Sequence, residues 1–253
     1  MWTNRTKAQI DAGKTVYGPF IRFPGPLAIE QAALAGFDFV LIDGEHSSLT
    51  LAQVETMIYA AYAAGITPLV RWPEASRQAF QRLLDMGVQG IMVPHVDTEA
   101  EARTIGRAAR FAPAGERGMA GPVLGNGWGA LSPAETAAYF DRQVLTLAQI
   151  ESLEALEILD QIAAQPGIDI LFVGPLDLSQ AMGIPGEVTH PRLLAAIDQV
   201  IAAAARAGKQ TGIYVGTPEA GQYWKERGVR FIATGLDTVL LKQAFTSLRA
   251  ALG

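Results

Sequence analysis

Three ionisable residues, Asp43, Glu45 and His46, follow directly on the apolar run FVLI at residues 39–42. An apolar run of this length that leads into Gly is typical of a buried strand followed by a turn. Carboxylates and an imidazole at the end of such a strand are costly to desolvate unless they pair or bind a ligand. They are therefore candidates for acid–base chemistry, although Asp43 and Glu45 could instead cap the helix predicted from Leu51.

Arg71 and two further carboxylates also end apolar runs. Arg71 closes TPLVR, and a guanidinium in that place must face carboxylates or an anionic ligand. Glu151 follows LAQI, and Asp177 follows ILFVGPL. Each of these could be a helix N-cap, but two carboxylates brought together repel unless they share a proton or a cation. Because Mg²⁺ takes one or two carboxylates together with waters and substrate oxygens, we expect a divalent metal here.

The elements that position these residues alternate along the chain. Short apolar runs are each followed by a stretch with helical periodicity, and most of the predicted helices end at Gly. Eight such strands predict a parallel sheet that closes into a single-domain α/β fold, a (β/α)8 TIM barrel over residues 1–253. An open doubly wound sheet is the alternative, but no G-x-G-x-x-G follows the first strand. The predicted strands are residues 15–22, 38–43, 67–71, 90–93, 144–150, 168–173, 210–214 and 231–234.

Barrel enzymes carry their chemistry at the C-terminal ends of the strands. Those ends gather the residues above together with Gln149 and the segment 174–177, whereas the opposite ends carry the residues of ordinary turns. His95 and His190 are expected to be structural. None of the five lysines stands at a catalytic strand end, which excludes a Schiff-base mechanism. Chemistry at a carbonyl carbon would then depend on a metal acting as a Lewis acid.

Composition narrows the range of partners. A net charge of −5 disfavours nucleic acid and anionic membranes, and the absence of Cys excludes disulfides and thiolate catalysis. The N-terminal segment lacks the apolar core of a signal peptide, and no apolar run approaches the length of about 18 residues that spans a membrane. We therefore expect a cytoplasmic protein that acts on small molecules. The glycine-rich stretch 113–132 is expected to approach a ligand or to move over a site.

Motifs spread over nearly the whole chain resemble one family. The segments FDFVLIDGEHSSLT, PLVRWPE, LLDMGVQGIMVPHVDTEAEAR, ERGMAG, LAQIES and GIDILFVGPLDLSQAMGIPG occur in order and are similar to those of the HpcH/HpaI family of metal-dependent class II aldolases. The resemblance implies reversible cleavage of a 4-hydroxy-2-oxo acid to pyruvate, or a close 2-oxo acid, and an aldehyde, with Mg²⁺, Mn²⁺ or Co²⁺ as cofactor. It also implies a barrel whose last helix is swapped between subunits of a hexamer, a trimer of dimers.

The resemblance also implies roles for individual residues. Glu151 and Asp177 match the metal ligands, His46 the general base, and Arg71 the residue that stabilises the enolate. Asp85 matches an acidic residue that raises the basicity of the histidine. Since its predicted helix carries Asp85 away from its own site, a neighbouring subunit would have to donate it. The positions that match pyruvate-binding residues are Gln149, Gly174, Leu176 and Asp177.

We further expect Gly44 to let the chain turn sharply, so that His46 faces the substrate while Asp43 holds its imidazole. The sequence departs from the pattern of the HpcH/HpaI family at two places where the aldehyde half of the substrate would bind. No basic residue follows Arg117 in RGMAGPVLGNGWG, which argues against a second substrate carboxylate bound by that stretch, and Leu176 stands where a small residue is usual. An acyl-CoA lyase of the citrate or malyl-CoA lyase type and a non-catalytic ligand-binding barrel are the alternatives.

Overall fold

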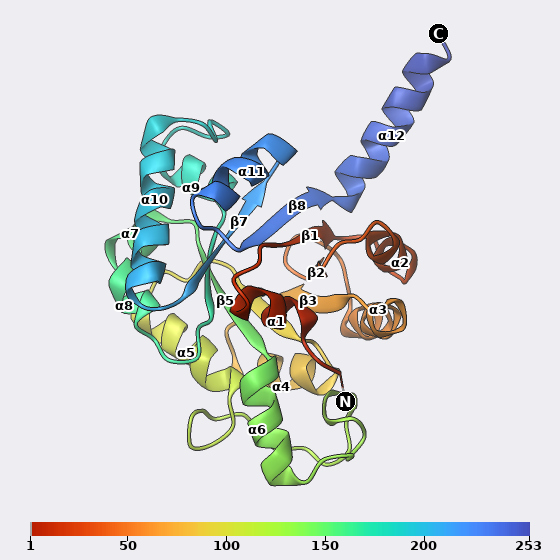
Figure 1. The fold of residues 1–253 in the computed structure, drawn as a ribbon, viewed down its shortest axis with the longest axis vertical. Coiled ribbons are helices and arrows are strands. Elements are labelled where there is room, and N and C mark those ends of the chain that lie inside the picture. The colour runs from red at the N-terminus through yellow and green to blue at the C-terminus, as the bar shows by residue number, and fades with distance from the viewer. Residues whose placement is uncertain (1) are drawn as a thin grey trace.

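The computed structural model describes residues 2–253, and within them eight parallel strands close into a barrel in the order β1 to β8 (Figure 1). The (β/α)8 prediction is confirmed, and the open doubly wound alternative is wrong. Each predicted strand is present, with ends that shift by one or two residues at most. The strands are β1 (Val16–Ile21), β2 (Phe39–Asp43), β3 (Thr67–Arg71), β4 (Gly90–Val93), β5 (Leu145–Ile150), β6 (Ile170–Val173), β7 (Gln210–Val215) and β8 (Phe231–Leu236).

Helices surround this barrel because parallel strands need crossover connections and bury both of their faces. Every residue of β2 to β6 is buried, as their uninterrupted apolar runs require. The helices are α1 (Arg5–Asp11), α2 (Leu27–Leu34), α3 (Leu51–Ala64), α4 (Arg77–Asp85), α5 (Glu99–Ala109), α6 (Pro133–Gln143), α7 (Leu153–Glu157), α8 (Leu159–Ala163), α9 (Pro175–Ala181), α10 (Pro191–Arg206), α11 (Pro218–Glu226) and α12 (Asp237–Ala251), with a 3₁₀ turn at Leu124–Asn126.

Aromatic side chains fill the inside of the barrel. Phe39 of β2 stacks on Phe231 of β8 with ring centroids 4.2 Å apart, and Phe172 of β6 meets Phe231 edge-on at 6.0 Å. All three rings are fully buried. The barrel interior is therefore a packed core, and the polar residues at the strand ends rest on a rigid floor.

The glycine-rich stretch 113–132 contacts the outer helices. Arg77 Nε at the start of α4 donates to the Glu116 carbonyl at 2.6 Å, and a Cβ at Gly125 would lie 2.3 Å from the Leu84 carbonyl oxygen. Within the part of the chain that the structure describes, no residue of this stretch lines the cavity at the strand ends. The expectation that it approaches the site is therefore wrong within one copy of the chain.

Helix α12 extends away from the barrel (Figure 1) and has no buried residue. Several large apolar side chains on it are exposed, which is typical of a surface that another molecule covers. The predicted exchange of this helix between subunits remains a prediction. Among residues 2–253, no helix is both long and apolar enough to cross a membrane. The exposed large apolar side chains of α12 are Val239, Leu240, Leu241, Phe245 and Leu248, and Leu252 follows at its C-cap.

Candidate active site

A cavity of about 430 Å³ lies at the C-terminal ends of the strands. It brings together side chains from β1, β3, β5 and β7 with residues that follow β2 and β6, and several of the residues singled out in the sequence are among them. Its wall contains both polar and apolar residues. The polar lining residues are Arg22, His46, Arg71, Gln149 and Asp177, and the others are Phe20, Phe172, Gly174, Pro175, Leu176, Tyr214 and Leu236.

Asp43 and Arg71 form a buried bidentate ion pair. The two residues are direct neighbours in the register of β2 and β3, so their side chains meet at the same level of the barrel. Arg71 Nε and Nη2 donate to the two Asp43 carboxylate oxygens at 3.0 and 2.8 Å, and Arg71 Nη1 lies 3.1 Å from Glu45 Oε2. Burial acts to raise the pKa of Asp43, but the hydrogen bonds and charges of the arginines outweigh it and lower the pKa below its ordinary value. Asp43 is therefore ionised.

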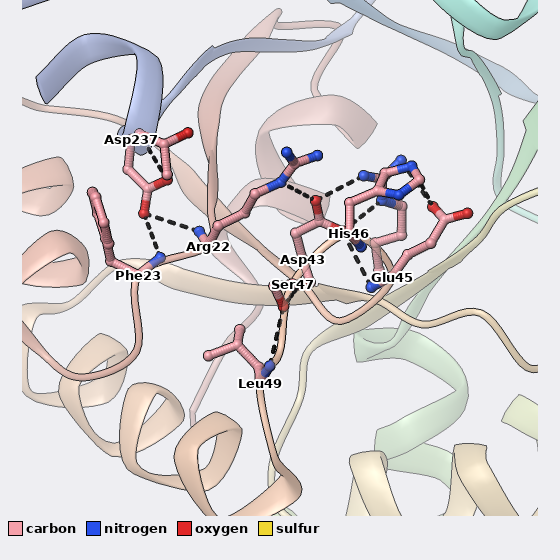
Figure 2. A network of polar contacts seen from close by, with 10 residues as sticks. Arg22, Phe23, Asp43, Glu45, His46, Ser47, Leu49 and Asp237 are labelled. Atoms are coloured by element: carbon pink, nitrogen blue, oxygen red, sulfur yellow. Dashed lines mark hydrogen bonds and ion pairs between the residues drawn. The ribbon is translucent and has the colours of Figure 1, made fainter. Parts of the chain in front are cut away.

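A second arginine, Arg22, contacts the same carboxylate. Arg22 follows β1 directly, and its Nε donates to Asp43 Oδ2 at 2.7 Å (Figure 2). The backbone N–H groups of Arg22 and Phe23 both donate to Asp237 Oδ2, at 2.9 and 2.8 Å, which fixes the chain at this point. Sequence reasoning missed Arg22 as a site residue. The signal was present, because Arg22 ends an apolar run in the same way as Arg71.

His46 lies beside Glu45 rather than Asp43. Its imidazole is 51% exposed, and Nε2 is 3.6 Å from Glu45 Oε2. Asp43 Oδ1 instead accepts from the backbone N–H groups of Glu45 and His46, both at 3.2 Å. The expectation that Asp43 holds the imidazole is therefore wrong, because the two arginines occupy its carboxylate. Asp43 positions the loop that carries His46 (Figure 2).

The role expected for Gly44 is also corrected. Its φ is not among the positive values that glycine alone adopts readily, so the turn does not depend on its conformational freedom. A Cβ at this position would instead lie 2.5 Å from the indole ring of Trp72. Gly44 is needed because the Trp72 ring presses against the backbone of the loop.

Glu151 and Asp177 are close enough for their charges to interact, and Asp177 lines the cavity. Glu151 is buried, its Oε1 accepts from the His95 N–H at 3.0 Å, and its Oε2 accepts from Gln149 Nε2. Burial raises the pKa of Glu151 to about 7; His95 opposes this rise, and the nearby charges of Asp177 and Glu45 add to it. A second carboxylate nearby disfavours the ionised form of a buried carboxyl group. Such a pair is typical of a site that binds a proton or a cation.

Gly174 lets the Glu151 carboxylate pack directly against the backbone after β6. A Cβ at Gly174 would lie 2.3 Å from Glu151 Oε2. Gln149 Oε1 is buried without a hydrogen-bond partner in the described residues. No group of three or more His, Asp or Glu residues in the range 2–253 forms a metal cage. Two carboxylates with open positions fit Mg²⁺ or Mn²⁺, which keep waters and substrate oxygens as ligands.

His95 has the structural role expected of it. Its φ of +49° is unusual for a residue other than glycine, and this conformation directs its N–H to the Glu151 carboxylate. Its Nδ1 lies 3.5 Å from the same oxygen. His95 therefore fixes the position of Glu151 from the loop after β4.

Asp85 is not brought to the cavity of its own chain. It is the last residue of α4 and accepts from Arg117 Nη2 at 2.7 Å. The Arg117 guanidinium is buried and lies over the rings of Phe140 and Phe111, at 3.9 and 4.7 Å from their centroids. A contribution of Asp85 to catalysis remains a prediction that requires a second subunit.

Comparison with known proteins agrees with this geometry. Residues 17–244 match the family described as HpcH/HpaI aldolase/citrate lyase. The chain belongs to this family. The resemblance inferred from its motifs is thereby confirmed, and the chain is a carbon–carbon lyase of the HpcH/HpaI type.

Two curated relatives and one solved structure illustrate the similarity within the HpcH/HpaI family. The hydroxypyruvate/pyruvate aldolase of Pseudomonas aeruginosa is 38% identical over 97% of this chain and 91% of that protein. The 4-hydroxy-2-oxo-heptane-1,7-dioate aldolase of Shigella sonnei is 36% identical over 99% and 95%. The crystal structure of an HpcH/HpaI aldolase from Desulfitobacterium hafniense DCB-2 has a TM-score of 0.92 at 31% identity, over 97% of this chain and 95% of that one.

Proposed function

We propose that this protein catalyses reversible aldol cleavage of a 4-hydroxy-2-oxo acid to pyruvate, or a close 2-oxo acid such as hydroxypyruvate, and an aldehyde. The observation that carries the proposal is a cavity at the strand ends that gathers Arg71 and His46 with Asp177, whose charge interacts with the buried Glu151. The names of the relatives in Pseudomonas aeruginosa and Shigella sonnei support the same substrate class.

Glu151 and Asp177 would hold a divalent metal ion, Mg²⁺, Mn²⁺ or Co²⁺. When bound, the metal supplies Lewis-acid polarisation of the substrate ketone. The protein holds Glu151 ready for this role through the His95 N–H and the Gln149 amide. Gln149, Gly174, Leu176 and Asp177, the positions expected to bind pyruvate, line the cavity together and would bind the 2-oxo acid there.

His46 and Arg71 would carry the proton and the charge. His46 takes the proton of the C4 hydroxyl, the C3–C4 bond breaks, and the aldehyde leaves while the electrons form the pyruvate enolate. Arg71 is fixed by Asp43 and Glu45, so its charge is already in place when the enolate oxygen becomes negative. Return of a proton to C3 gives pyruvate. Glu45, 3.6 Å from His46 Nε2, is the carboxylate that would stabilise the protonated imidazole.

We also propose that α12 packs on a second copy of the chain in a hexamer. The absence of any buried residue in α12 and its exposed apolar side chains support this assembly. Such an assembly would also be required for Asp85 to reach another subunit's cavity. Light scattering of the purified protein measures the oligomer directly, and a monomer at micromolar concentration would contradict the proposal.

The first experiment is proton NMR of pyruvate in D₂O, because methyl-proton exchange reports the enolate without any choice of aldehyde. The protein is stripped with EDTA, and Mg²⁺ or Mn²⁺ is added back. We expect metal-dependent exchange in the wild type and a loss of orders of magnitude in Arg71→Ala. Arg71→Lys keeps the charge but cannot bridge Asp43 and Glu45, so it should also be slow.

The control for this experiment is Arg206→Ala, which removes an exposed arginine that pairs with Asp160 on the outer helices. Near-normal exchange in both Arg71 variants would contradict the role of Arg71. Absence of exchange in the wild type under every metal would contradict pyruvate as the donor. In that case other 2-oxo acids and acyl-CoA thioesters, the alternative substrate class, should be tested next.

A further inference from the structure

Arg22 differs from Arg71 because part of its guanidinium is not paired with any protein group in the described part of the chain. All three side-chain nitrogens of Arg71 are paired with Asp43 or Glu45. Arg22 uses only Nε, and neither of its terminal nitrogens has a hydrogen-bond partner within the range 2–253 that the structure describes. Figure 2 shows both terminal nitrogens directed away from Asp43. Arg22 therefore presents the free end of a guanidinium at the wall of the cavity.

Neutralisation of Asp43 does not account for Arg22. The Asp43 carboxylate already accepts two hydrogen bonds from Arg71 and two from the backbone of Glu45 and His46. Arg22 adds a fifth donor to a group that is satisfied without it. The side chain of Arg22 is 29% exposed, so its charged end is only partly solvated.

The position of Arg22 is fixed before any ligand arrives. Asp237 accepts from the backbone N–H groups of Arg22 and Phe23, and Asp43 accepts from Arg22 Nε, so the backbone and Nε of Arg22 are both anchored. Anchoring reduces the conformational entropy that a long side chain loses when it binds. A planar guanidinium with two free, parallel N–H groups matches a carboxylate in bidentate geometry.

Several of the residues that line the cavity together with Arg22 are apolar or aromatic. Phe20 and Tyr214 meet edge-on with centroids 5.8 Å apart, and Leu236 and Leu176 line the same cavity. The charge of Arg22 reaches Tyr214, because it opposes the rise that burial causes in the pKa of this phenol. In surroundings of low polarity an ion pair with Arg22 would be worth more than the same pair in water.

We propose that Arg22 is a specificity-determining residue that binds a carboxylate on the aldehyde half of the substrate, so that the cavity selects an acid aldehyde over a neutral one. This inference rests on the proposed aldol function and names the substrate class of the same site. The stretch after Arg117 has no basic residue that could bind a second substrate carboxylate. Arg22, which follows β1, would bind this carboxylate instead.

The test compares two aldehydes of equal chain length, succinic semialdehyde and butanal, as partners for pyruvate. The measured quantity is the ratio of their kcat/KM values. Any effect of a variant on the shared chemical steps, including one that acts through Asp43, cancels in this ratio. In Arg22→Gln we expect the ratio to fall by about 10- to 100-fold, which corresponds to the loss of one charge-assisted interaction. Arg22→Lys should recover part of the loss, and Arg206→Gln should leave the ratio unchanged.

A ratio that changes by less than about threefold in Arg22→Gln would overturn the proposal, since a lost charge-assisted bond exceeds that factor. An equal decrease in kcat/KM for both aldehydes would also overturn the proposal, because it would show that Arg22 acts only by positioning Asp43.

A binding measurement separates failure of this inference from failure of the aldol proposal. Calorimetry with Mn²⁺ present compares 2-oxoheptanedioate with 2-oxoheptanoate, which share the seven-carbon chain of the adduct of pyruvate and succinic semialdehyde and differ in the terminal carboxylate. Preference for 2-oxoheptanedioate that is lost in Arg22→Gln supports the carboxylate site even if the wild type does not exchange pyruvate protons. Equal binding of the two acids by the wild type would overturn it.

Discussion

A methyl group added at Gly174 would lie 2.3 Å from Glu151 Oε2 and 2.8 Å from Gln149 Nε2. The backbone of Gly174 has φ −95° and ψ 86°, so alanine meets no conformational barrier, and the effect of Gly174→Ala is a steric one. Ordinary van der Waals contact begins near 3.4 Å. The Glu151 carboxylate, or the strand end that carries Gly174, must therefore move by about 1 Å, and a misplacement of that size costs about 10²-fold in rate.

Gly216→Ala is the matched control for this substitution. Gly216 also follows a barrel strand, β7, but no atom lies within 4 Å of the Cβ that alanine would add there. We expect Gly174→Ala to exchange pyruvate methyl protons about 10²-fold more slowly than Gly216→Ala at saturating Mn²⁺. Its Mn²⁺ affinity should also be lower, because Glu151 can no longer accept from the His95 N–H in the same position.

Thermal unfolding distinguishes a local from a global effect. Overpacking at one site costs about 1–3 kcal/mol, so Gly174→Ala should melt at a lower temperature than the wild type while its barrel stays folded. If Gly174→Ala bound Mn²⁺ and exchanged pyruvate protons at the rate of Gly216→Ala, the assignment of Glu151 to the reaction would be refuted.

Three further predictions concern Glu151, Gly44 and His46. In metal-free protein the folded pKa of Glu151 is raised to about 7 from 4.5, so its contribution to stability is present below pH 4.5 and decreases by about 3 kcal/mol as the pH rises through about 7. Chemical denaturation after EDTA treatment should show this decrease, and Glu151→Gln should abolish it. Gly44→Ala should destabilise the protein by about 1–3 kcal/mol, measured in urea, because its Cβ meets the Trp72 ring; unchanged stability would contradict that contact. His46→Ala should lose about 10²- to 10⁴-fold in cleavage of a 4-hydroxy-2-oxo acid and keep its Mn²⁺ affinity. Loss of Mn²⁺ binding in this variant would instead make His46 a metal ligand.

The sequence predicted the barrel well because its strands are buried on both faces. Runs such as FVLID and TPLVR are uninterrupted and lie between Gly-ended helices, so their limits are visible without any tertiary information. The ring of polar residues followed from topology alone, since parallel strands place all their C-terminal ends on one side.

The sequence did not predict which of the polar residues at the strand ends pair with one another. Whether Asp43 binds His46 or Arg71 depends on the register of β2 and β3, which sets Asp43 directly beside Arg71. The sharp contact between Gly44 and Trp72 arises between two loops, and loop packing leaves no periodic signal. The stretch 113–132 does not line the cavity of its own chain. Its glycines allow close packing against α4 and α5, and composition does not distinguish this use from that of an active-site loop.

Closure of the barrel has a consequence for how the chain folds. The last pairing joins Val16 of β1 to Phe231 of β8, which come from opposite ends of the described sequence, and the ring stack of Phe39 on Phe231 forms only when the circle is complete. Contacts between such distant segments are slow to form, because the loop-closure entropy must be lost before the contact compensates for it. Before β1 pairs with β8, both strands are open edges with unpaired N–H and C=O groups, and the aromatic rings inside the barrel are exposed to solvent. This combination favours association of partly folded chains. Refolding yield should therefore depend steeply on protein concentration, and dilution should recover the native protein.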